Sequence, residues 1–149
     1  MASEFFGNLS QLVEEEDRID WSDYEEFKVL EPGWYDAVVD MSDAKKDKTP
    51  NGNRVLNFHV RVKADGKEHK VRARVFLTGG GRFLTEHLLR AVGVQDFRSI
   101  TSTGQLIQAT HGKPVRVLLR KEVSQQGNEF NTVNGYRAPS DASGEINVL

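Results

Sequence analysis

Basic side chains alternate with apolar ones along two nearby segments, residues 57–63 and 70–76. The alternation has the period of a β-strand, so one face of a sheet would carry the apolar residues and the other face the polar ones. The polar positions of the two segments carry no acidic residue, and they are Asn57, His59, Arg61, Lys63, Lys70, Arg72, Arg74 and Phe76. Cations contact phosphates and an exposed ring stacks on a base, so this face predicts a surface that binds single-stranded nucleic acid. The alternative interpretation is an ordinary solvated strand face.

A tight turn between the two segments indicates that they pair. Asp65-Gly66 lies at the centre of residues 64–67, and Asp-Gly between alternating runs is a strong hairpin pattern because glycine accepts a positive φ. Residues 53–78 are therefore predicted to form two long antiparallel strands. Their apolar face would consist of Leu56, Phe58, Val60, Val62, Val71, Ala73, Val75 and Leu77.

The remaining elements suggest a small barrel. Strands are predicted at residues 34–41, 115–121 and 129–137, with a helix at 82–92 and a helical turn at 105–110 between the third and fourth strands. Residues 42–52 and 124–128 are predicted loops. The order β-β-β-α-β-β predicts a mainly β fold, a five-stranded OB-fold-like barrel, because closure removes exposed sheet edges.

The ligand face of such a barrel surrounds its second and third strands and is flanked by the loops between strands one and two and between strands four and five. Basic residues on or near those elements extend the predicted nucleic-acid interface to Lys45, Lys46, Lys48, Arg54, Arg116 and Arg120. Trp34 has outward parity and is a second candidate for base stacking. Phe130 or Tyr136 is expected near the rim.

Charge divides the chain into three parts. Residues 1–31 carry a net charge of −8 and the remainder carries +6, which together give the net charge of −2. We predict an acidic N-terminal arm at 1–31, the barrel at 32–138 and a flexible tail at 139–149. The arm contains Trp21, Tyr24 and Phe27 among its acids. It could pack on the barrel as a strap, compete with nucleic acid for the basic face, or bind a separate protein.

Several function classes have no support in the sequence. There are no cysteines, which excludes disulfides and thiolate metal sites and fits a reducing compartment such as the cytoplasm. No apolar run is long enough to predict a membrane span. The four histidines form no His-Glu-x-x-His motif, and no Walker motif or nucleophile elbow occurs. We therefore expect no catalytic residues, no metal, no cofactor and no enzymatic activity.

Three short runs resemble a known family, in this order: residues 31–37 (EPGWYDA), 51–58 (NGNRVLNF) and 131–136 (NTVNGY). The family is phage-encoded, has long been classed as a domain of unknown function, and is similar to OB-fold single-stranded DNA-binding proteins encoded near phage replication and recombination genes. The resemblance covers residues 30–138. It implies sequence-independent binding of single-stranded DNA in phage DNA replication or recombination, in the host cytoplasm, with phage replication or recombination proteins as further partners. A homo-oligomer is compatible with this interpretation.

One feature departs from that comparison. Many single-stranded DNA-binding proteins end in an acidic tail with an aromatic tip, whereas residues 144–149 here contain one acid and no aromatic. The second hypothesis is accordingly a protein-interaction barrel whose basic face docks an acidic partner. Aromatic rings on the basic face distinguish the two, because base stacking requires them and charge pairing does not.

Overall fold

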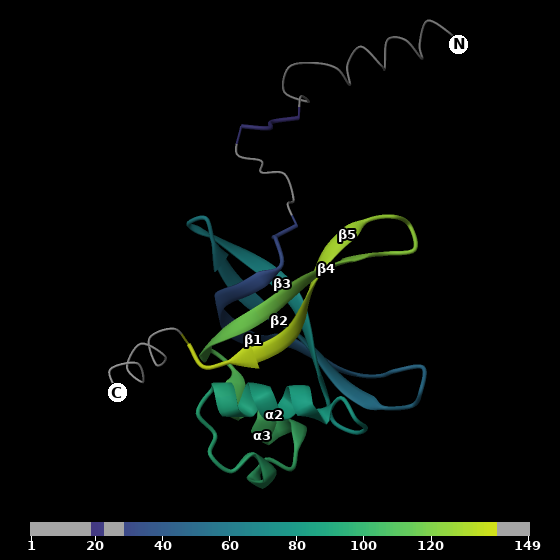
Figure 1. Cartoon of the computed structure of the whole chain (residues 1–149), viewed down its shortest axis with the longest axis vertical. Helices are drawn as coiled ribbons and strands as arrows, with labels where there is room; N and C mark the ends of the chain where they lie inside the picture. The colour runs from purple at the N-terminus through teal and green to yellow at the C-terminus, as the bar shows by residue number, and fades with distance from the viewer. Residues whose placement is uncertain (1–18, 23–28, 140–149) are drawn as a thin grey trace, which may run out of the picture.

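The computed structural model describes residues 19–22 and 29–139, and the predictions for the rest of the arm and for nearly all of the tail lie outside these residues. The described part is built on one antiparallel sheet with the strand order β3-β2-β1-β4-β5 (Figure 1). Its strands are β1 (Gly33–Lys48), β2 (Arg54–Ala64), β3 (Lys67–Phe76), β4 (Pro114–Val123) and β5 (Glu129–Arg137). Between β3 and β4 lie α2 (Arg82–Ala91), the short 3-10 helix η2 (Phe97–Ser99) and α3 (Thr103–Thr110). The predicted mainly β fold and the order of its elements are confirmed.

The predicted hairpin is β2 and β3. Ala64 pairs with Lys67, and Asp65 and Gly66 have φ angles of 55° and 72°. Positive φ at both central residues is what a two-residue type I′ turn requires, and its twist matches that of the strands. Every member of the predicted apolar face is buried except Leu77, which is half-buried.

The core lies between the inner face of the curved sheet and the helices. Phe58, Val60, Val117 and Leu119 are almost fully buried on the sheet side, and Leu88 of α2 is fully buried opposite them. Figure 1 shows α2 and α3 covering one end of the sheet. α3 begins with a capping box in which Ser102 and Gln105 exchange side-chain-to-backbone hydrogen bonds. Because this cap starts the helix at Thr103, α3 is two residues longer than the helical turn predicted at 105–110.

The sheet does not close into a barrel. β3 and β5 are its two edge strands, and no ladder joins them in the described residues. The strands curve enough to bring Cα atoms of β3 and β5 within 8 Å of each other, and α2 packs against both edges. The closed barrel predicted from the sequence is therefore an open five-stranded sheet.

β1 is longer than predicted. Its last four residues, Lys45 to Lys48, pair with Arg54 to Asn57 of β2, and because β1 runs on to Lys48, most of the predicted polar loop at 42–52 is strand. The irregularity between Asp40 and Lys45 interrupts the ladder, because four residues of β1 face a single residue of β2 there. Polar residues hid this extension in the sequence, since a solvated hairpin needs no apolar alternation. None of the helices in the described ranges is long and apolar enough to cross a bilayer.

Candidate nucleic-acid interface

The basic residues predicted on the second and third strands do share one outward face. Register pairs Asn57 with Arg74, His59 with Arg72, and Arg61 with Lys70. The arginines and Lys70 are exposed, whereas Asn57 and His59 are half-buried. This part of the predicted site is assembled by a single hairpin, which is why the alternation in the sequence was sufficient to find it.

Carboxylates of β1 and of β3 itself pair with Arg61 and Lys70, two of the five Lys and Arg side chains on that face. Arg61 Nε lies 2.9 Å from Asp40 Oδ2, and Arg61 Nη1 lies 3.2 Å from Glu68 Oε1. Lys70 Nζ lies 2.7 Å from Asp43 Oδ2, which is also 3.9 Å from His59 Nδ1. Asp40 and Asp43 belong to β1, so the absence of acids within each predicted strand gave no warning of them.

Asp40 is the buried member of this network. Its Oδ1 accepts hydrogen bonds from the Ser42 backbone N–H at 3.0 Å and from Ser42 Oγ at 2.5 Å, while its Oδ2 accepts one from Arg61 Nε. These contacts, those of Ser42 above all, hold the pKa of the Asp40 carboxyl well below its ordinary value. Asp40 therefore stays ionised and keeps Arg61 engaged.

Arg72 and Arg74 are different. Both are exposed on β3, and neither forms an ion pair with a carboxylate of the described residues. Arg74 Nε donates a hydrogen bond to Asn57 Oδ1 at 2.8 Å, which orients the guanidinium without neutralising it. The cationic part of the face that remains available to an anion is thus centred on these two arginines.

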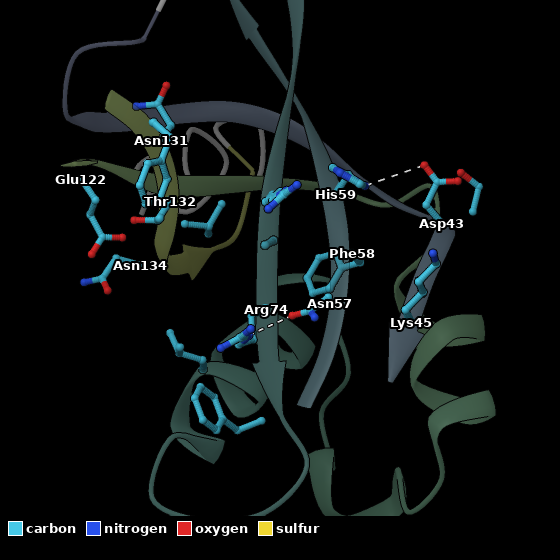
Figure 2. A pocket seen from close by; sticks show the side chains of 18 residues that line it. Asp43, Lys45, Asn57, Phe58, His59, Arg74, Glu122, Asn131, Thr132 and Asn134 are labelled. Atoms are coloured by element: carbon cyan, nitrogen blue, oxygen red, sulfur yellow. Dashed lines mark hydrogen bonds and ion pairs between the residues drawn. The ribbon is translucent and has the colours of Figure 1, made fainter. Parts of the chain in front are cut away.

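A groove of about 990 Å³ opens beside them, between the edges of β3 and β5 (Figure 2). β3 contributes Arg72, Arg74 and Phe76, and β5 contributes Phe130 to Asn134. Figure 2 shows Asn131, Thr132 and Asn134 on one side, Arg74 and Asn57 in the middle, and His59, Asp43 and Lys45 on the other side. The groove exists because the sheet is open, so no property of a single strand could predict it.

Each wall of the groove carries an aromatic ring. Phe130 of β5 is 38% exposed, and Phe76 of β3 is half-buried. Phe76 lies against Gly81, where an added Cβ would come within 2.6 Å of the ring, so a residue without a side chain is needed there. Thr85 Oγ1 also donates a hydrogen bond to the Phe76 carbonyl at 2.6 Å. Tyr136, the other expected rim residue, is instead buried in the core, because a bulge at Asn134 turns it inward.

The other predicted residues do not line the groove, apart from Lys45. Lys46, Lys48 and Arg54 are exposed on the β1–β2 hairpin, while Arg116 and Arg120 lie on β4. Trp34 is not an open stacking surface, since the Arg137 guanidinium lies 3.6 Å above its ring centroid. Within the described ranges, no group of three or more His, Asp or Glu residues is placed to hold a metal ion.

Part of the chain is similar to a family whose function is unknown. Residues 81–145 match the model of a family described as a protein of unknown function (DUF669). The match includes α2, α3, β4 and β5, and hence the β5 wall of the groove, but not β1 to β3. No curated protein matches the chain.

Proposed function

We propose that this protein binds single-stranded DNA without marked sequence preference, in the groove between β3 and β5. The observation that carries the proposal is the combination of two exposed arginines without an acidic partner among the described residues and an aromatic ring on each wall of one groove. Arg72 and Arg74 would contact phosphates, and Phe76 and Phe130 would stack on bases. Stacking on a ring tolerates every base, which accounts for the absence of sequence preference.

The arrangement of strands supports the same proposal. The order β3-β2-β1-β4-β5, with helices between β3 and β4, is that of a partly open OB-fold barrel, a fold that binds oligonucleotides around its second and third strands. We propose this fold for the chain. The resemblance of residues 30–138 to phage proteins encoded near replication and recombination genes further suggests that the DNA is a replication or recombination intermediate.

Ion pairing divides the basic residues into two groups. Arg61 and Lys70 would have to give up Asp40, Glu68 or Asp43 before they contact a phosphate. Among the described residues, Arg72 has no carboxylate partner to give up, and Arg74 gives up only its hydrogen bond to Asn57. We therefore expect the two unpaired arginines to supply most of the salt-dependent binding.

The test is a titration of labelled single-stranded and duplex oligonucleotides at several salt concentrations, followed by fluorescence anisotropy. We expect tighter binding to the single strand. Arg72→Ala and Arg74→Ala should each weaken binding and reduce the slope of log affinity against log salt by about 0.7, the change for one phosphate contact on a single strand. Arg61→Ala should change both quantities less.

Arg98→Ala is the matched control, since Arg98 is exposed but lies on η2, outside the groove. It should leave binding unchanged. Equal or tighter binding to duplex DNA, or an Arg98→Ala effect as large as that of Arg72→Ala, would refute the proposal. Failure to bind any oligonucleotide would favour the protein-interaction alternative, in which the same arginines meet an acidic protein.

A further inference from the structure

A second group of charged residues lies in one row across the sheet, away from the groove. Register places Asp36 of β1 opposite Arg116 of β4, and Arg116 opposite Arg137 of β5. Like charges directly opposite each other on a sheet are destabilising. Asp36 Oδ1 lies 3.8 Å from Arg116 Nε, and no carboxylate of the described residues forms an ion pair with Arg137. The row is therefore short of negative charge.

Trp34 holds Arg137 in place. The guanidinium carbon lies 3.6 Å from the ring centroid, which is a close cation–π contact. Gly135, two residues before Arg137 on β5, leaves room for the indole, since a Cβ there would already be 3.4 Å from Trp34 Cη2. A guanidinium stacked in this way keeps its planar set of donors and loses less conformational freedom when it binds an anion.

Arg116 has a donor that no described residue of the protein accepts. Its Nε is buried and has no hydrogen-bond partner, because the 3.8 Å separation from Asp36 is too long for a hydrogen bond. A buried donor without an acceptor costs free energy. An anion between Arg116 and Arg137 would supply that acceptor and remove the repulsion between the two side chains.

A small cavity borders the same row. Its volume is about 180 Å³, several times the ~30 Å³ that a water molecule occupies in the liquid. Asp36, Lys63 and Pro139 line it, whereas Arg116 and Arg137 do not, so the cavity connects to the row only through Asp36. Lys63 is exposed and forms no ion pair with the described residues, so it adds a third available cation.

We propose that Arg116 and Arg137, backed by Trp34 and flanked by Lys63, form a phosphate-binding site separate from the groove. One source of the phosphate is the backbone of a nucleic-acid strand that leaves the groove along β5. This source depends on the proposed function. The other source is a small phosphorylated molecule, and this source does not depend on the proposed function. Planar guanidinium groups bind the oxygens of either ligand in the same way.

The first experiment uses Trp34 as its own probe. The chain has two tryptophans, so Trp21→Phe leaves Trp34 as the sole tryptophan, and excitation at the red edge of indole absorption avoids the tyrosines. Pyrophosphate is titrated against a chloride control at equal ionic strength. We expect a saturable change in Trp34 emission, because pyrophosphate binding shifts the Arg137 guanidinium that lies above the indole ring. Arg116→Ala or Arg137→Ala, added to Trp21→Phe, should weaken pyrophosphate binding about tenfold, the loss of a charge-assisted hydrogen bond.

Arg98→Ala in the same background is the matched control, because Arg98 also lies over a ring, 5.5 Å from the centroid of Phe97, but belongs to η2 and not to the row of Asp36, Arg116 and Arg137. It should leave the titration unchanged. Arg137→Lys keeps the charge and should recover only part of the affinity. Thermal melting of each variant shows whether it is folded before it is compared.

The second experiment compares a short oligonucleotide that fits the groove with a longer one. If Arg137→Ala weakens binding of the long oligonucleotide alone, the site takes the DNA backbone. A response to pyrophosphate without any oligonucleotide binding would support the site for a small phosphorylated ligand and count against the proposed function. If oligonucleotides bind through Arg72 and Arg74 while Arg116→Ala and Arg137→Ala change neither titration, the phosphate site is refuted and the proposed function stands.

Discussion

Asn131 attaches the segment before β1 to the wall of the groove, and its removal should destabilise the fold. Its Oδ1 accepts a hydrogen bond from the Leu30 N–H at 2.8 Å, and its Nδ2 donates one to the Leu30 carbonyl at 2.9 Å. Nδ2 also donates to the Arg120 carbonyl at 3.2 Å. Asn131 and Leu30 are 9% and 8% exposed, so water cannot easily replace these bonds.

The size of the effect follows from the groups left behind. Asn131→Ala strips the buried N–H and C=O of Leu30 of their partners, and each unsatisfied group costs about 1–3 kcal/mol. The segment can avoid that cost by detaching, but it then loses the burial of the Leu30 side chain, worth about 1.5–3 kcal/mol. We therefore expect the free energy of unfolding to fall by about 2–4 kcal/mol.

Urea denaturation followed by circular dichroism measures this change as a lower midpoint. Asn134→Ala is the matched control on the same strand, because Asn134 is exposed at the bulge, and it should change stability by no more than about 0.5 kcal/mol. An Asn131→Ala loss as small as that of the control would refute the reasoning. It would mean that Asn131 does not hold the Leu30 segment in solution.

Three further predictions concern charge and stacking. Phe76→Ala should weaken DNA binding by about 1–3 kcal/mol with an unchanged salt slope if its ring stacks on a base; a large fall in melting temperature instead would assign the ring to the core. The contacts of Asp40 lower its pKa in the folded protein, so the stability that they provide should be complete above about pH 5. That stability should fall as the pH drops below the pKa of an unfolded aspartate, about 3.9. Asp40→Asn should therefore flatten the acid limb of a plot of unfolding free energy against pH. Deleting residues 2–28 should tighten DNA binding, most of all at low salt, if the acidic arm competes for Arg72 and Arg74; unchanged affinity would favour a partner-docking arm, and loss of folding a structural one.

The sequence alone was enough for local features that alternating apolar residues or turn residues mark. Period-two alternation and Asp65-Gly66 defined the β2–β3 hairpin, and a hairpin has only one register once its turn is fixed. That register placed Arg72 and Arg74 on one outward face, as the structure confirms. The net charge of −8 on residues 1–31, the absence of cysteine and the order of the elements also follow from composition and pattern.

Tertiary structure decided every feature that depends on strands far apart in the sequence. Pairing of β1 with β2 brings Asp40 and Asp43 to the basic face, where they pair with Arg61 and Lys70, and no pattern within residues 57–76 could show these two contacts. The approach of β3 to β5 creates the groove, and pairing of β4 with β5 sets Arg116 against Arg137. Side-chain periodicity fixes which face a residue occupies, but the register between distant strands, set by packing of the whole core, fixes which charge it meets there.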